Sequence, residues 1–213
     1  MSVGKYKDSE NALALSAISK ATPGMLCLAD QLFMSFEIFQ AAKETGAELL
    51  FRARTDRKLA KEMVLPDGSY LSTIYDSGDR HRLDGIAVRV LDFDLDKTLN
   101  DETTPHPYRL ITTLTDHEQF PLEELADLYH ERWEIETMLD EMKTHLMGGE
   151  PLRSRTSDLA IQEIYGMVMA HYVIRAVMAD AASKAKMDPD GLSFTHARNV
   201  VERNLPKIGA FPP

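Results

Sequence analysis

The 213-residue sequence lacks several features that define common classes of protein. Its one cysteine, Cys27, excludes an internal disulfide and a cysteine-rich zinc site, and we expect it to act as a small apolar side chain on a buried strand. No apolar run reaches the roughly 18 residues that a membrane-spanning helix needs, and residues 1–8 lack the apolar core of a signal peptide. We therefore expect a cytoplasmic protein without membrane contact.

The motifs of zinc and nucleotide chemistry are also missing. The seven histidines include neither a His-x3-His pair nor a His-Glu-x-x-His motif, so a zinc site is not indicated. Gly148-Gly149 is not followed by the Lys-Ser or Lys-Thr pair of a phosphate-binding loop. The sequence therefore gives no reason to expect nucleotide hydrolysis.

Three acidic residues, Asp92, Asp94 and Asp96, alternate along one expected strand and so share a face. A calcium-binding loop needs a glycine and a bidentate glutamate at fixed positions, and Lys97 and Thr103 occupy them here. We therefore favour a solvent-facing strand edge over a calcium site.

The formal net charge is −10, whereas DNA-binding proteins usually carry an excess of Lys and Arg that displaces counterions from phosphates. The charge is unevenly distributed, because basic residues gather in one stretch and acidic residues in another. The basic cluster is Arg52, Arg54, Arg57, Lys58 and Lys61, and the acidic one is Asp92, Asp94, Asp96, Asp101 and Glu102. A local basic patch binds DNA, though weakly on an acidic protein.

The start of the chain predicts a helix followed by a strand. The helix is expected over residues 9–20, capped by Asp8 or Ser9. The strand at 25–29 is continuously apolar, which indicates burial on both faces at the centre of a sheet. It stops at Asp30, and α/β folds place ligands at the carboxyl ends of such strands. Asp30 is therefore a candidate site residue.

The next segments predict a βαβ unit and then an antiparallel section. A helix over residues 35–45, closed by Gly46, leads to a strand at 47–54. Turn signals between residues 64 and 115 separate short strands, namely 70–75, 86–93 and 108–114. The C-terminal part predicts two further helices, at 156–185 and, capped by Ser193, at 193–204.

A single helix is predicted from residue 122 to about 147, because this stretch has no Pro or Gly until Gly148-Gly149. At about 100° per residue, four polar side chains fall within an arc of roughly 60° on one side of it. They are Tyr129, Arg132, Glu136 and Lys143. The alternative is a solvated helix face with ordinary ion pairs, such as Arg132 with Glu136.

The same predicted helix has an apolar face that we expect to dock on a core. Its residues are Leu128, Ile135, Leu139, Met142 and Leu146. Trp133 lies at the flank, where packing is favoured over stacking on a DNA base.

The pattern Tyr-x2-Arg-x3-Glu-x6-Lys of these four side chains resembles the signature of insertion-sequence transposases of the Asp-Asp-Glu (DDE) superfamily, in the subgroup named for its Tyr-Arg-Glu-Lys box. Residues 23–30 resemble the strand that delivers the family's second catalytic Asp, and 49–54 the strand that follows. Residues 152–156 and the helix through Glu163 and Tyr165 are similar to the family's C-terminal segment.

The resemblance implies a partial ribonuclease-H-like α/β fold, with a mainly antiparallel β insertion and a helical C-terminal segment. The implied division is a partial core at 1–57, the insertion at 58–116, the catalytic-glutamate helix at 117–150 and the helical region at 151–213. The insertion separates Asp30 from Glu136 in sequence, so the resemblance implies that these two carboxylates meet in space.

The resemblance also implies chemistry and partners. Asp30 and Glu136 would bind Mg²⁺ or Mn²⁺ for DNA strand cleavage and transfer. Tyr129, Arg132 and Lys143 would contact the DNA backbone at transposon ends. Arg52 and Arg54 of the basic cluster are further DNA-binding candidates. The expected place is the bacterial nucleoid, with self-association or pairing with a full-length transposase as a further expectation.

The sequence departs from the family in two places. The family's first catalytic Asp has no counterpart, since Asp8 and Glu10 precede or open a helix, and we expect an N-terminally truncated copy. Gln31-Leu32-Phe33 follows Asp30 where relatives commonly carry Arg-Gly-aromatic. An active transposase and a catalytically silent fragment that binds DNA or a full-length relative both stay open, beside a structural α/β protein that matches the box by chance.

Overall fold

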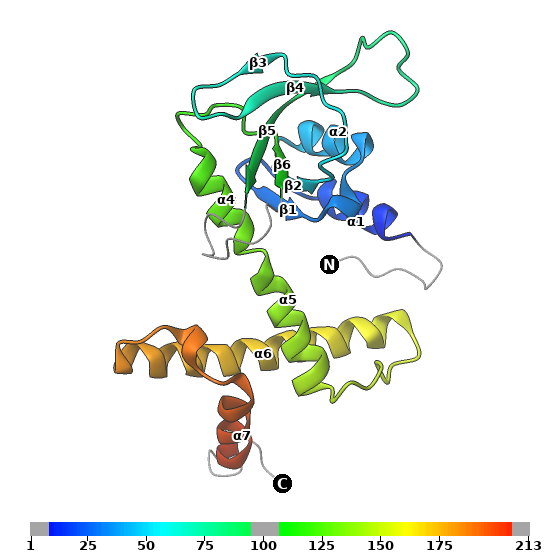
Figure 1. Cartoon of the computed structure of the whole chain (residues 1–213). Coiled ribbons are helices and arrows are strands. Elements are labelled where there is room, and N and C mark those ends of the chain that lie inside the picture. The colour runs from blue at the N-terminus through cyan, green and yellow to red at the C-terminus, as the bar shows by residue number, and fades with distance from the viewer. Residues whose placement is uncertain (1–8, 95–106, 206–213) are drawn as a thin grey trace. The chain divides into compact units, whose positions relative to one another are not determined.

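A computed structural model describes residues 9–94 and 107–205 of the chain (Figure 1). The chain divides into two compact units, residues 1–132 and 133–213, and each is described here by itself.

The first unit is built on one six-stranded sheet. In the order β1-β2-β6-β5-β4-β3, its strands are Leu26–Ala29, Glu48–Ala53, Pro107–Thr112, Ile86–Asp94, Tyr70–Ile74 and Met63–Val64. β1 and β2 are parallel, and every other neighbouring pair is antiparallel. The predicted α/β class, the βαβ unit and the antiparallel section are confirmed, and the mixed sheet is consistent with a ribonuclease-H-like transposase fold.

α1 (Glu10–Ile18) and α2 (Phe36–Thr45) begin at the capping residues that the sequence indicates, and α1 ends at Ile18, two residues before the expected end. α1 is capped by the Ser9 hydroxyl, which accepts from the Ala12 N–H. α2 is capped in the same way by Ser35. It ends at Gly46, whose φ of 72° lies in the left-handed region that favours glycine. α2 therefore carries the chain from β1 back to a parallel β2.

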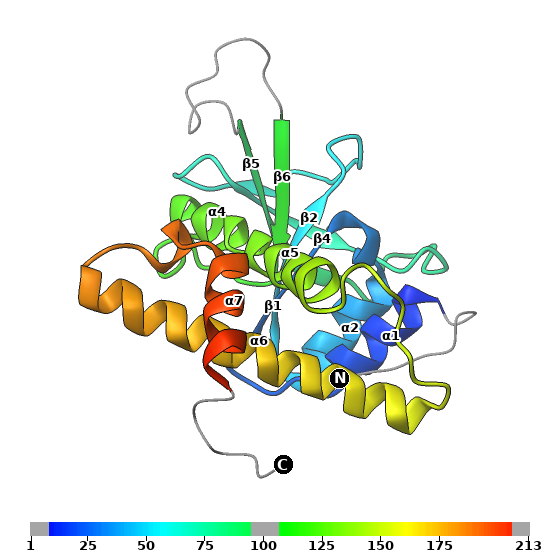
Figure 2. The ribbon, with the colours of Figure 1, turned by 90° about the horizontal axis from the view of Figure 1, so that it is seen from below.

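Apolar side chains alternate along the strands of the sheet, so each face carries its own core. α1 and α2 cover one face, and α4 (Leu122–His130) covers the other (Figure 2). Leu49, Phe51 and Val90 belong to the core beneath α1 and α2. Leu50 and Leu110 point to the opposite face, where α4 packs through Leu125 and Tyr129. Cys27 packs at the edge of the first core, as expected for a small apolar side chain.

The predicted central position of the first strand is wrong. Among the described residues, β1 lies at an edge of the sheet with β2 as its strand neighbour, and its four residues are only half-buried. Helices on the two faces of the sheet, rather than a second neighbouring strand, cover the apolar run of β1. A continuously apolar strand therefore indicates that both of its faces are covered, and it does not by itself indicate a central position in the sheet.

A buried arginine on β5 attaches the segment before α4 to the sheet. Arg89 on β5 is fully buried and forms an ion pair with Asp67. Its Nε donates to the Ser69 hydroxyl at 2.8 Å, and its Nη1 donates to the Phe120 carbonyl at 2.6 Å. The guanidinium thus ties the β3–β4 turn to the segment that enters α4.

The second unit is helical. Its elements are α5 (Trp133–Asp140), the π-helical turn η2 (Glu141–Leu146), α6 (Ser157–Ala185), the short turn η3 (Pro189–Gly191) and α7 (Phe194–Asn204). Thr156 caps α6 and Ser193 caps α7, which confirms the last two predicted helices. Ile174, Met178 and Phe194 form the core of this unit. Within the described ranges, every helix is too short or too polar to cross a membrane.

One carboxylate attaches residues 152–156, the stretch similar to the family's C-terminal segment, to α6. Glu163 of α6 accepts from the backbone N–H groups of Arg153 at 3.1 Å and Ser154 at 3.0 Å. A hydrogen bond from the Ser154 hydroxyl, together with these backbone bonds, lowers the pKa of Glu163. The segment therefore has a defined attachment to the helix that follows it.

The prediction of one helix from 122 to 147 is wrong. α4 ends at His130, Glu131 is its C-terminal cap, and α5 begins at Trp133. Glu131 and Arg132 are good helix formers, so composition gives no sign of the break. The break coincides with the boundary between the two units, and the side chain of Tyr129 is anchored in the first of them. Tertiary packing here overrides local propensity.

The predicted docking of the apolar face is also wrong for part of that face. Leu128, Ile135 and Leu139 are exposed, whereas Met142 is buried and Leu146 packs on the core of the second unit. The expected face assumed one continuous rod, and the break after α4 divides it. Trp133, for which packing was favoured, has 54% of its surface exposed.

Candidate active site at the carboxyl end of the first strand

Asp30 follows β1 directly, at the carboxyl end of the strand. Its Oδ1 accepts from the Gln31 N–H at 2.6 Å, which caps the short helical turn that comes next. The side chain is half-buried, and its second oxygen makes no hydrogen bond to the residues that the structure describes. That oxygen is a hard ligand of the kind that Mg²⁺ and Mn²⁺ prefer.

Tyr129 joins α4 to the same strand end. Its hydroxyl donates to the backbone carbonyl of Ala29, the residue before Asp30, at 3.0 Å. Burial raises the pKa of this phenol far above its ordinary value, so it stays neutral and keeps its proton as a hydrogen-bond donor. Tyr129 therefore holds the backbone that carries Asp30.

Tyr108 of β6 is a member of the site that the sequence did not indicate. The Arg52 guanidinium lies over its ring, 4.6 Å from the centroid, and the ring of Tyr129 lies 6.0 Å away, centroid to centroid. Burial is the main cause of the raised pKa of Tyr108. Its contacts depend on the pairing of β2 with β6, which no local pattern specifies.

The remaining residue of the first unit's site is Arg132. Its guanidinium lies over the ring of Tyr129, 5.5 Å from the centroid. The structure thus brings together four predicted site residues of the first unit: Asp30 after β1, Arg52 on β2, Tyr129 on α4, and Arg132 in the turn that follows α4. Two cations and a carboxylate surround a pair of phenols.

A shallow basic hollow of about 280 Å³ opens beside Asp30. Its lining includes Gln31, Arg52, Arg54, Asp56 and Arg109. Arg54 forms an ion pair with Asp56 at 2.6 Å, and this hydrogen bond lowers the pKa of the carboxylate. Of the two predicted DNA-binding arginines that line this hollow, Arg54 is paired with a carboxylate, whereas the guanidinium of Arg52 lies over the ring of Tyr108.

Arg109 in the same hollow is paired with Asp92 at 2.6 Å. The hydrogen bonds that the Arg109 guanidinium donates to this carboxylate raise the pKa of Arg109. Asp92 is exposed, and the pairing of β5 with β4 ends at Val90, so the predicted solvent-facing edge is confirmed for Asp92, which also forms a cross-strand ion pair with Arg109. The side chain of Asp94 and all of Asp96 lie outside the described residues.

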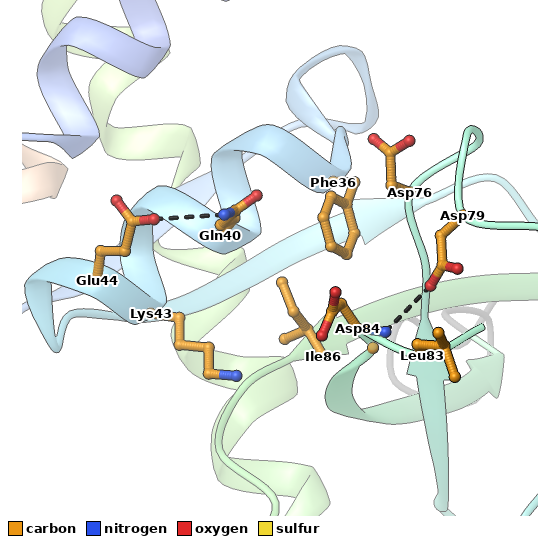
Figure 3. A pocket seen from close by; sticks show the side chains of 10 residues that line it. Phe36, Gln40, Lys43, Glu44, Asp76, Asp79, Leu83, Asp84 and Ile86 are labelled. Carbon is orange, nitrogen blue, oxygen red and sulfur yellow. Dashed lines mark hydrogen bonds between the residues drawn. The ribbon is translucent and has the colours of Figure 1, made fainter. Parts of the chain in front are cut away.

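A larger hollow, of about 850 Å³, lies elsewhere in the first unit and has the wrong charge for DNA (Figure 3). Its lining includes Lys43 but also four carboxylates, Glu44, Asp76, Asp79 and Asp84. Phosphates would be repelled from this surface. None of the predicted site residues lines it.

Glu136 and Lys143 belong to the second unit. Glu136 is exposed on α5, and Lys143 is exposed on the π-helical turn. The meeting of Glu136 with Asp30 stays a prediction. Within residues 9–94 and 107–205, no group of three or more His, Cys, Asp or Glu side chains gathers as a metal site. Asp30 is half-buried and Glu136 is exposed, and carboxylate side chains are of the chemical type that fits the donor set of a divalent ion.

Two comparisons with known proteins bear on this site. Residues 2–173 match the family described as Transposase DDE domain. Over 215 aligned residues, the chain is 29% identical to transposase InsG for insertion sequence element IS4 of Escherichia coli strain K12. That alignment covers 98% of this chain and 48% of the relative, so the chain spans about half the length of the curated relative it matches. The chain belongs to the DDE transposases of insertion sequences.

Proposed function

We propose that this chain carries part of the catalytic and DNA-binding machinery of a DNA transposase. Asp30 and Glu136 hold a divalent ion, Mg²⁺ or Mn²⁺, and the DNA is a transposon end. The observation that supports this most is the gathering of Arg52, Tyr129 and Arg132 around the strand end that bears Asp30.

The proposed roles follow from the chemistry of each side chain. A divalent ion, when bound, activates the attacking oxygen and stabilises the leaving oxygen of a phosphodiester. Arg132 and Arg52 present planar forks that suit phosphate oxygens, whereas Lys143 acts as a point charge. Arg54 contributes less, because Asp56 neutralises it. Tyr129 is buried, so we propose that it contacts DNA only through its hydroxyl group or acts indirectly, by positioning Arg132.

The Tyr-Arg-Glu-Lys subgroup belongs to the same proposal. Tyr129, Arg132, Glu136 and Lys143 match its box without a gap. In this proposal, Tyr129 and Arg132 are the box residues of the first unit, and Glu136 and Lys143 are the box residues of the second. Association with a second copy or with a full-length transposase, at DNA in the nucleoid, is part of the proposal as well.

A DNA-binding measurement tests this function. Because the net charge is −10, we expect weak binding of a short fluorescent duplex that declines steeply as salt rises. Arg52→Gln is expected to weaken binding roughly 5-fold at low salt and to reduce the salt slope by about 1, as for one lost phosphate contact.

The control for that measurement is Arg80→Gln, an exposed arginine that lies outside the basic hollow near Asp30. Fluorescence anisotropy over a salt series gives both quantities. Binding by the parent chain that is unaffected by Arg52→Gln, or equally weakened by Arg80→Gln, would contradict the assignment of the site.

The second candidate function is a catalytically silent DNA-binding protein. It is favoured by the two carboxylates assigned here, because two carboxylates chelate a metal pair poorly. A cleavage assay of the 213-residue chain on a terminal-repeat duplex with Mg²⁺ separates the two candidates. Cutting that Glu136→Gln abolishes supports the enzyme, and binding without cutting supports the silent protein.

A further inference from the structure

The link between Glu136 and Lys143 is not a plain α-helix. Glu141–Leu146 form a π-helical turn, in which the Met147 N–H donates to the Met142 carbonyl at 3.0 Å, five residues back. Such turns are rare and concentrate at functional sites. A π-helix has more residues per turn than an α-helix, so this turn sets the angle between the side chains of Glu136 and Lys143.

Glu141, the first residue of the turn, is anchored by two side chains of α6. One of its carboxylate oxygens lies 2.7 Å from Nε2 of His171 and accepts from Nε of Arg175 at 3.0 Å. The other oxygen accepts from Nη2 of Arg175 at 2.8 Å. Glu141 is only 7% exposed, and Asp190 lies 3.2 Å from Arg175 on the outer side. A buried carboxylate so bonded cannot turn away without leaving charges unpaired.

The other end of the turn is anchored by α7. Arg198 donates to the backbone carbonyl of His145, and the Thr195 hydroxyl lies 3.4 Å from Nδ1 of the same histidine. Phe194 stacks on His171, with ring centroids 5.3 Å apart. Two helices therefore hold the turn at both ends, while Lys143 between the anchors is exposed.

We propose that Glu141, His171 and Arg175 are positioning residues of the transposase site. They fix the π-helical turn and thereby the direction in which Lys143 faces DNA relative to Glu136. Arg198 supports the same turn from α7. A structural ion-pair network alone would need no π-helical turn between two site residues. The inference rests on the proposed function, because it assumes that Lys143 contacts DNA.

A double-mutant cycle on the full chain tests the inference, with a short fluorescent DNA duplex as the probe. In the parent chain, Lys143→Gln is expected to weaken binding roughly 5-fold to 10-fold at low salt. In a Glu141→Gln background, the same change is expected to weaken it less than about 2-fold, since Lys143 is no longer directed at a phosphate.

Two further variants keep the test decisive. Arg175→Lys keeps the charge but loses the bidentate hydrogen bond to Glu141, so we expect the same loss of coupling. This variant replaces Glu141→Gln if circular dichroism shows that Glu141→Gln is unfolded. Asp180→Asn is the matched control, because it breaks an exposed ion pair with Lys184 on the same helix. It should leave the effect of Lys143→Gln unchanged.

The outcomes separate this inference from the proposed function. If Lys143→Gln has no effect in the parent chain, the proposed DNA contact of Lys143 is wrong, and the inference falls with it. If Lys143→Gln weakens binding equally in the parent, Glu141→Gln and Arg175→Lys backgrounds, the DNA contact stands and the positioning role is wrong.

Discussion

Replacement of Tyr129 by alanine is expected to lower the free energy of unfolding of the first unit by about 3 to 5 kcal/mol. The ring is only 2% exposed and packs in the core that α4 forms with the sheet. Its loss leaves a cavity between Leu125 and Tyr108 and removes the hydrogen bond to Ala29. Urea unfolding followed by circular dichroism measures the change.

Tyr129→Phe is the matched variant, because it keeps the ring and removes only the hydroxyl. We expect it to cost about 1 kcal/mol, the usual net contribution of one hydrogen bond. It also frees the backbone before Asp30, so any metal or DNA affinity of the site should fall more than the stability does. Equal and small losses for Tyr129→Ala and Tyr129→Phe would show that the ring is not part of the core.

The second large effect is expected at the buried Arg89. Asp67→Ala should destabilise the first unit by about 3 to 5 kcal/mol, because it leaves a fully buried guanidinium without its carboxylate. The double variant Asp67→Ala with Arg89→Met should be more stable than Asp67→Ala alone, since it buries no unpaired charge. A double variant that is less stable than Asp67→Ala would contradict this account of the ion pair.

The same pair predicts a pH dependence. Burial alone would raise the pKa of Asp67, but hydrogen bonds from Ser69 and the charge of Arg89 outweigh it, so the pKa lies below its ordinary value. Its stabilising contribution is therefore fully present above about pH 4, the region of the unfolded carboxyl's pKa, and is lost as pH falls through the folded value. Asp67→Asn should flatten this part of the acid unfolding curve.

The boundaries of most elements could be predicted from the sequence, because they depend on local chemistry. Ser35 and Gly46 mark the two ends of α2 through a hydroxyl cap and a left-handed backbone. Thr156 and Ser193 mark helix starts in the same way. Local patterns of this kind do not report which strands become neighbours, and β1 was therefore misplaced at the centre of the sheet.

The candidate site could be predicted only where a motif named its residues. Tyr129 bonds to the residue before Asp30 and carries Arg132 over its ring, whereas the roles of these residues stay predictions. Tyr108 entered through β2–β6 pairing between distant segments. The break at Glu131 and the π-helical turn were not predictable, because neither segment contains a Pro or Gly that would interrupt a helix. Tertiary anchors at Tyr129 and Glu141 account for these positions.

We propose that Asp30 and Glu136 share one divalent ion although they belong to different units. Titration of the 213-residue chain with Mn²⁺, followed by electron paramagnetic resonance, tests it directly. We expect a bound Mn²⁺ whose affinity Asp30→Asn, Glu136→Gln and the double variant weaken to the same extent, with Glu134→Gln on the same helix as the unaffected control. Mn²⁺ binding that survives either single change, or losses that add in the double variant, would show that the two carboxylates do not hold the same ion.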